Sequence, residues 1–220
     1  MKYCYKVRRL LTNLFSGFLF GVILMNASIS YGEPVILAFG DSLTAGFGVD
    51  PNDSYPARLQ RLLVEKGYHY KVINAGVSGD TTAGGLRRLD WLMKHNPKIV
   101  ILALGANDGL RGMPIDEMQS NLEKIIQRCQ KIEVKILLAG MKMLPNYGKE
   151  YTDSFHQVYH HLSKKYDLPL IPFLLEGVAG RREYTREDGI HPLGVGYEII
   201  TQTVWKELLP LLPSDSNSRS

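Results

Sequence analysis

The chain has 220 residues, a formal net charge of +4 and two cysteines. This length suits one domain, and its 45% hydrophobic and 22% charged residues are ordinary for a globular protein. Two cysteines exclude a disulfide framework and a cysteine-based zinc site. The first 32 residues carry four Lys and Arg and no Asp or Glu, and the other 22 basic residues balance 22 acidic ones. A neutral body argues against nucleic-acid binding.

Residues 1–32 have the three-part pattern of a secretory signal peptide. Cations precede an apolar run from Leu14 to Met25, and small residues follow from Ala27 to Gly32. This order of segments is typical of a leader that directs export and is then cleaved. The run is short for a membrane span of roughly 20 residues, which favours a cleaved leader. The alternative is an uncleaved N-terminal membrane anchor. We predict an exported protein, periplasmic or secreted, or anchored to the inner membrane if the leader stays.

The rest of the chain alternates apolar strands with amphipathic helices. Strands are expected at 35–39, 70–73, 99–103, 134–139 and 170–173. Helices are expected at 55–66, 82–96, 114–131, 155–166 and 192–209. Strands joined by helix-length connections form a parallel sheet with helices on both faces. The sequence therefore predicts one α/β domain over residues 33–212, followed by a disordered tail at 213–220.

Candidate site residues follow the predicted strands at four places. Ser42 lies in Gly-Asp-Ser-Leu after the first strand, Gly79 after the second and Asn107 after the third. Asp188 and His191 lie in Asp-Gly-Ile-His-Pro, between the fifth strand and the last helix. The C-terminal strand ends of such folds gather at one edge, where ligands bind. Together these residues supply a nucleophile, oxyanion donors, a base and a carboxylate to orient it, which are the parts of acyl transfer.

The four blocks resemble those of the SGNH hydrolases, also called GDSL esterases. The resemblance covers the chain from about residue 35 to residue 209, and the stretch from Gly105 to Gly112 is similar to the bacterial thioesterase, lysophospholipase and arylesterase branch. It implies a three-layer α/β/α sandwich of flavodoxin-like type with a five-stranded parallel sheet.

The resemblance also implies the roles of single residues. Ser42, Asp188 and His191 would be catalytic, and the amides of Ser42 and Gly79 with the side chain of Asn107 would form the oxyanion hole. Neither a metal nor an organic cofactor is expected. The implied activity is hydrolysis of aryl esters, acyl thioesters or lysophospholipids through an acyl-enzyme on Ser42.

The partners and the alternatives follow from the same pattern. We expect a monomer that takes a small-molecule ester or thioester, including membrane-derived lysophospholipid. No insertion is large enough for a lid domain, so the groove over the sheet edge should be open. A carbohydrate O-deacetylase of the same fold is one alternative. A non-catalytic, membrane-tethered binding protein is the other.

Several other reactive residues have structural interpretations. Ser78 falls one glycine short of a Gly-x-Ser-x-Gly elbow. Asp108 is predicted to brace its own loop, and Cys129 to fill the core from the apolar face of a helix. His156 and His160 have the spacing of a metal pair, but no third ligand is evident, so a solvated helix face is expected.

Overall fold

The computed structural model describes residues 32–213 of the chain. Almost all of the predicted leader and of the predicted tail therefore lies outside the described residues. The domain contains one parallel sheet with strand order β2-β1-β3-β4-β5. Its strands are β1 (Val35–Gly40), β2 (Lys71–Gly76), β3 (Pro97–Ala103), β4 (Lys135–Ala139) and β5 (Leu170–Ile171).

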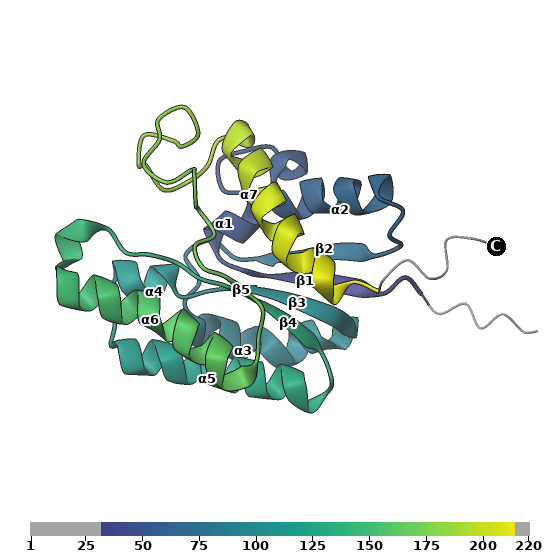
Figure 1. Ribbon diagram of the computed structural model, residues 1–220, viewed down its shortest axis with the longest axis horizontal. Helices are drawn as coiled ribbons and strands as arrows, with labels where there is room; N and C mark the ends of the chain where they lie inside the picture. Colours follow the sequence, from purple (N-terminus) through teal and green to yellow (C-terminus); the bar gives the residue numbers. More distant parts are fainter. Residues whose placement is uncertain (1–31, 214–220) are drawn as a thin grey trace, which may run out of the picture. The chain divides into compact units, whose positions relative to one another are not determined.

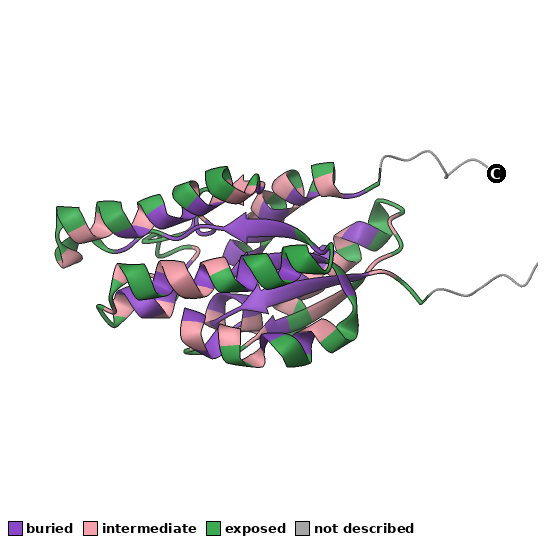
Figure 2. Ribbon diagram, turned by 90° about the horizontal axis from the view of Figure 1, so that it is seen from below, coloured by how far each residue is buried: buried purple, intermediate pink, exposed green. Residues whose placement is uncertain are grey.

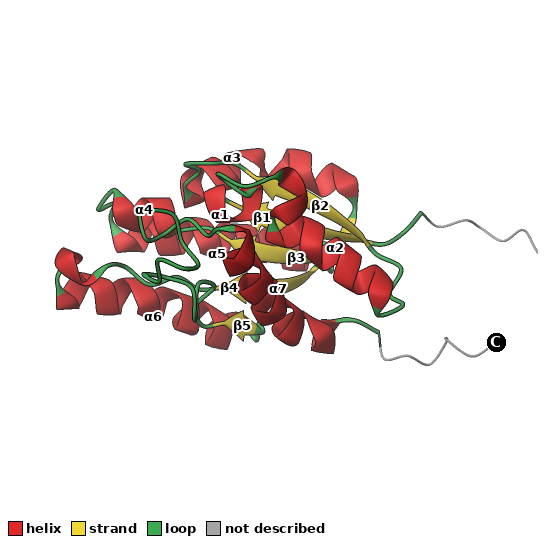
Figure 3. Cartoon of the chain, turned by 90° about the horizontal axis from the view of Figure 1, so that it is seen from above, coloured by secondary structure: helices red, strands yellow, loops and turns green. Residues whose placement is uncertain are grey.

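Seven α-helices connect and follow the strands of the described range. They are α1 (Ser42–Ala45), α2 (Tyr55–Glu65), α3 (Thr82–Leu92), α4 (Ala106–Leu110), α5 (Ile115–Lys131), α6 (Lys149–Tyr166) and α7 (Gly194–Leu208). On one face of the sheet α2 packs against α7, and Figure 3 shows α7 crossing the strands there. On the other face α3, α5 and α6 form a row (Figure 1). This arrangement confirms the predicted three-layer α/β/α sandwich.

The central strands are mostly apolar because helices cover both of their faces. Every residue of β1 is buried, and so is every residue of β3 except Lys98 (Figure 2). The edge strand β2 differs, since Lys71 and Asn74 are exposed. The apolar centre of the sheet fixes the position of the strand ends that carry the polar blocks.

The predicted elements occur in the predicted order, with differences at their ends. β5 stops at Ile171 because Pro172 has no N–H with which to continue the ladder. The 82–96 helix ends at Leu92 and continues as one 3₁₀ turn. The short helices α1 and α4 were not expected. No helix within residues 32–213 is both long enough and apolar enough to cross a membrane.

Candidate active site

Ser42, His191 and Asp188 lie in one line at the carboxyl edge of the sheet. Ser42 Oγ is 2.9 Å from His191 Nε2. On the other side of the ring, His191 Nδ1 is 2.7 Å from Asp188 Oδ2. The structure therefore brings together a hydroxyl, an imidazole and a carboxylate from two segments that are far apart in the sequence.

The position of Ser42 follows from the way β1 ends. Gly40 is the last residue of the strand, and a Cβ at this position would lie 2.0 Å from Thr44 Oγ1. The chain can therefore turn sharply into α1, and Asp41 caps this helix by accepting a 3.0 Å hydrogen bond from the Leu43 amide. Ser42 is the first residue of α1, where a backbone N–H has no acceptor within the helix.

The loop before α7 holds the carboxylate and the imidazole together. Asp188 Oδ1 accepts the amides of Ile190 and His191, each at 2.8 Å. Burial by itself raises the pKa of Asp188, but these bonds and the bond from the His191 ring outweigh it, so the pKa lies below its ordinary value. The Arg186 amide in turn donates to the His191 carbonyl at 2.8 Å. Asp188 is thus held as a carboxylate facing the ring.

The donors predicted for an oxyanion lie across from this loop. Gly79 has φ +79°, a backbone conformation that favours glycine. Within residues 32–213, neither the Ser42 amide nor the Gly79 amide has a hydrogen-bond acceptor. Asn107 Nδ2 donates to the Asp80 carbonyl at 2.9 Å and to Asp41 Oδ2 at 3.3 Å. Both N–H groups of this carboxamide are therefore engaged in the free protein, one of them by the longer, weaker bond.

Asp41 is a buried carboxyl group that the sequence analysis did not single out. Its exposed fraction is 2%. Burial raises the pKa of Asp41 to about 6, against the lowering effects of the Leu43 amide and of nearby His191. In the sequence, only its position directly before Ser42 pointed to this residue. That position is equally well explained by a helix N-cap, the role that Asp41 also has in the structure.

Two further contacts beside the imidazole were also missed. The Phe47 ring lies 4.8 Å from the ring of His191, centroid to centroid. Arg186 Nη1 donates to the Gly48 carbonyl at 3.1 Å and so connects the loop before α7 to the segment after α1. A hydrogen bond to a backbone carbonyl cannot be predicted from residue types, because every residue has a backbone carbonyl.

The structure also places the residues that were given structural interpretations. Asp108 is 1% exposed and accepts bonds from the Thr82 amide at 2.8 Å and from its hydroxyl at 2.6 Å, which confirms its role as a brace. Cys129 is completely buried, and burial raises the pKa of its thiol to about 11, so it is a core residue as predicted. Ser78 is exposed, and its hydroxyl has no hydrogen-bond partner among residues 32–213.

The His156 and His160 side chains contact each other more closely than a solvated face implies. Their Nε2 atoms are 3.2 Å apart, and His156 Nδ1 is 3.3 Å from the Met141 carbonyl. Burial lowers the pKa of His156. Across the described part of the chain, no three His, Cys, Asp or Glu side chains gather into a group that could hold a metal ion.

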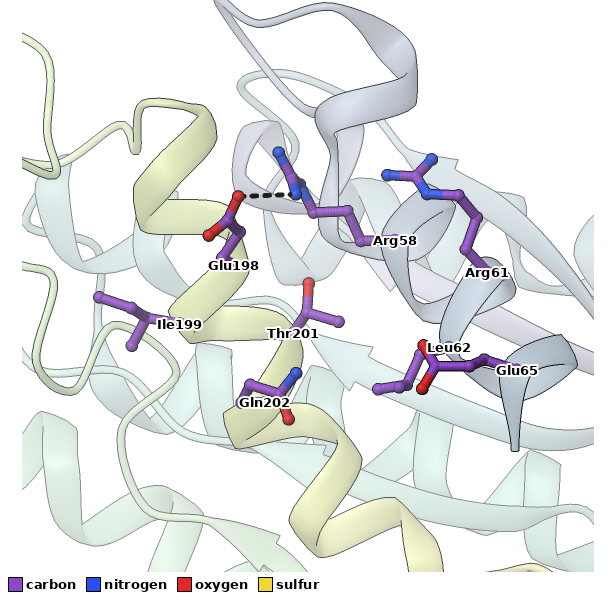
Figure 4. Close-up of a pocket in the computed structure, with 8 residues that line it drawn as sticks. All are labelled: Arg58, Arg61, Leu62, Glu65, Glu198, Ile199, Thr201 and Gln202. Atoms are coloured by element: carbon purple, nitrogen blue, oxygen red, sulfur yellow. Dashed lines mark hydrogen bonds and ion pairs between the residues drawn. The ribbon is translucent and has the colours of Figure 1, made fainter.

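Two cavities differ in their relation to the site. An apolar cavity of about 340 Å³ borders the loop before α7 at Asp188 and the start of α4 at Ala106. Another, of about 450 Å³, lies between α2 and α7 (Figure 4). In that second cavity Arg58 is paired with Glu198 at 3.1 Å, and none of the predicted site residues lines it. Of these two cavities, the first is the one that adjoins the predicted site residues.

Comparison with known proteins agrees with this geometry. The chain is 42% identical over 178 residues to Esterase TesA of Pseudomonas aeruginosa, covering 80% of this chain and 89% of that protein. It is 37% identical over 182 residues to Thioesterase 1/protease 1/lysophospholipase L1 of Escherichia coli, covering 82% and 86%. A crystal structure of TesA matches with a TM-score of 0.79 at 41% identity, covering 81% of this chain and 99% of that one.

The family pattern itself covers the whole site. The sequence pattern of the GDSL-like lipase/acylhydrolase family matches residues 38–199, which contain Ser42, Gly79, Asn107, Asp188 and His191. The match extends from β1 to α7, and so over all five strands of the sheet. By fold, by sequence and by the residues gathered at its sheet edge, the chain belongs to the GDSL-like lipase/acylhydrolase family, the SGNH hydrolases.

Proposed function

We propose that the domain at residues 33–212 is a serine esterase and thioesterase that forms an acyl-enzyme on Ser42. The observation that carries this proposal is the hydrogen-bonded line from Ser42 Oγ through the His191 ring to Asp188, with distances of 2.9 Å and 2.7 Å. A hydroxyl in contact with a base that is itself oriented by a third group is the arrangement of an activated nucleophile.

The reaction follows from the order of these groups. Ser42 Oγ attacks the acyl carbonyl carbon while His191 Nε2 takes the hydroxyl proton. Asp188 keeps the ring in the tautomer that presents Nε2 and stabilises the imidazolium that forms. His191 then gives the proton to the leaving alcohol or thiol. Water, deprotonated by the same ring, releases the acid and restores Ser42.

The negative charge that develops on the carbonyl oxygen needs donors on the opposite side. The free amides of Ser42 and Gly79 supply two of them. Asn107 supplies the third donor. Its bond to Asp41 Oδ2 is long, at 3.3 Å, and the oxyanion is a stronger acceptor that can replace this carboxylate. Donors that are in place before the charge develops stabilise the transition state more than the substrate.

The apolar cavity suits the acyl part of the substrate. Leu110, Met143, Leu144, Phe173 and Ile190 contribute to its lining, between the loops that follow β3, β4 and β5. Such a lining binds an aliphatic chain and leaves the leaving group on the open side of the site. The proposed substrates are therefore small-molecule esters and thioesters with an alkyl acyl chain, lysophospholipids among them.

The nucleophile is tested with two serine variants. Ser42→Ala should fold normally, hydrolyse no aryl ester and take up no aryl phosphonate probe, as measured by intact mass. Ser78→Ala is the matched control, since this exposed serine lies at the neighbouring strand end, and it should retain activity and labelling. Hydrolysis by the Ser42 variant together with an inactive Ser78 variant would overturn the proposal.

The alternatives are separated by comparing substrates. A series of p-nitrophenyl esters from acetyl to dodecanoyl, together with acetylated xylan, should show preference for chains longer than acetyl. Acetate release from the polysaccharide at a higher kcat/KM than any longer ester would favour the carbohydrate deacetylase. Absence of labelling on Ser42 would favour the non-catalytic binding protein.

We also propose that residues 1–32 direct export. The cations before a short apolar run and the small residues after it support this proposal. N-terminal sequencing of the protein from periplasm and medium should find a mature chain that begins between Ala27 and Pro34. Full-length protein in the membrane fraction would instead support the anchor.

A further inference from the structure

Arg88 joins three segments that meet at the proposed active site. It lies on α3, and its side chain is 21% exposed. Nη2 donates to the Gly40 carbonyl at 2.9 Å, and Nη1 donates to the Ala75 carbonyl at 2.7 Å. Nε pairs with Asp80 Oδ2 at 2.8 Å, and the guanidinium carbon lies 4.6 Å from the centroid of the Phe39 ring. One side chain therefore connects the ends of β1 and β2 with the loop that follows β2.

Two of these contacts, those to Gly40 and Asp80, adjoin groups used in the proposed reaction. Gly40 is two residues before Ser42. Asp80 follows Gly79, whose amide is a proposed oxyanion donor, and the Asp80 carbonyl accepts the 2.9 Å bond from Asn107 Nδ2. A displacement of Asp80 would therefore move the amide donor and the carboxamide donor together.

Two residues of α3 contact the Asp80 carboxylate, one at each oxygen. Arg88 contacts Oδ2, and the backbone at Gly84 lies against Oδ1, where a Cβ would come within 1.8 Å of the oxygen. The Asp80 side chain is only 10% exposed. The loop after β2 is thus fixed by a specific, largely buried ion pair in addition to its own turn.

We infer that Arg88 and Asp80 form a positioning pair that holds the Gly79 amide and the Asn107 carboxamide in register with Ser42. This inference rests on the proposed function, and neither residue of the pair acts on substrate directly. Only a guanidinium fits the role, because its planar fork donates in several fixed directions while a lysine ammonium is a single point charge on a flexible stem. A misplacement of about 1 Å at a reacting group can cost about 10² in rate.

The test compares Arg88→Lys with Arg87→Lys, its neighbour on the same helix, whose side chain makes no hydrogen bond within residues 32–213. Arg88→Lys should lower kcat for an aryl ester by about 10- to 100-fold with KM changed less than about twofold. The rate of Ser42 labelling by an aryl phosphonate should fall in parallel, since that reaction also places charge in the oxyanion hole. Arg87→Lys should change neither quantity.

A second, more conservative variant keeps the test valid if Arg88→Lys fails to fold. Asp80→Asn keeps the backbone carbonyl and the shape of the side chain but removes the charge, and it should lower kcat by about three- to tenfold. The double variant should be no slower than Arg88→Lys, because the two residues act as one unit. If Arg88→Lys does not fold, the Asp80→Asn result decides.

The outcomes separate this inference from the proposed function. Ser42→Ala with full activity would remove both. An inactive Ser42→Ala, with a folded Arg88→Lys or Asp80→Asn whose kcat stays within about twofold of the wild type, would remove the positioning pair alone. A loss of kcat that disappears on cooling to a temperature at which each variant is fully folded would also overturn it, because it would show that the pair serves only stability.

Discussion

Asp41 Oδ2 accepts a 3.3 Å hydrogen bond from Asn107 Nδ2, so the residue before the proposed nucleophile binds a proposed oxyanion donor. The two side chains come from the ends of β1 and β3, which are neighbours in the sheet. In the free protein a buried carboxyl group therefore occupies one donor of Asn107. The substrate oxyanion would have to compete with it.

Replacement of Asn107 should damage the transition state more than substrate binding. Asn107→Ala should lower kcat by roughly 10²–10³, the usual cost of one oxyanion donor, and should change KM little. Asn107→Asp should be at least as damaging, because a carboxylate repels the oxyanion instead of donating to it. Kinetics with one aryl ester and Tm for both variants provide the measurement. Near-normal kcat in a folded Asn107→Asp protein would remove this residue from the oxyanion hole.

Asp41 should make stability depend on pH in an unusual direction. Its pKa rises from 3.8 to about 6 in the folded protein, so the folded chain holds this proton more tightly than the unfolded chain does. The resulting stabilisation is present below the unfolded pKa and is lost as the pH rises through the folded one. Between about pH 4 and about pH 7, the wild type should lose about 2 kcal/mol of unfolding free energy relative to Asp41→Asn.

Urea unfolding of both proteins at the two pH values measures this difference. The comparison with Asp41→Asn removes the contributions of titrating groups that do not interact with Asp41. An identical difference in unfolding free energy at the two pH values would show that folding does not raise the pKa of Asp41.

Asp188→Asn should inactivate the enzyme while leaving the loop folded. The Asn side-chain oxygen can still accept the amides of Ile190 and His191, but its NH₂ group then faces the ring and favours the wrong tautomer. We expect kcat to fall by about 10⁴ with little change in Tm. The exposed Glu183 in the same loop provides the control, and Glu183→Gln should retain activity. Equal activity of the two variants would argue against the role of Asp188.

Thr82→Val tests the brace beneath the Asn107 helix. It removes the hydroxyl that donates to Asp108 at 2.6 Å and leaves a buried carboxylate oxygen without that partner. The free energy of unfolding should fall by about 2 kcal/mol. Thr203→Val removes a hydroxyl that donates to the Ile199 carbonyl of its own helix at 3.1 Å, and it should cost less than about 1 kcal/mol. Equal stability of the two variants in urea would contradict a bracing role.

The sheet and the gathering of the candidate site residues at one edge could be predicted because both leave simple patterns in the sequence. Strands covered on both faces appear as apolar runs, and parallel connection brings their C-terminal ends to one edge. The positions of Ser42 and Asn107 in short helices could not be predicted, since α1 and α4 are too short to show a helical period. Asp108 and Cys129 were predictable from their neighbours in the chain.

The contacts of Arg88, Phe47 and Arg186 left no comparable pattern. Arg88 and Arg186 bind backbone carbonyls of segments that are distant in the sequence. Phe47 meets His191 only because the loop before α7 folds over the end of β1. Such contacts depend on tertiary placement, which the order of residue types alone does not specify.

Because Asp188 and His191 are only three residues apart, they move together with one loop. Both belong to one loop, and the bonds between them lie within it. If this loop lifts away from α1, the 2.9 Å bond to Ser42 breaks first, while the carboxylate and the imidazole stay together. If the loop undocks before the sheet unfolds, mild heating should abolish activity below the unfolding temperature, and cooling should restore it.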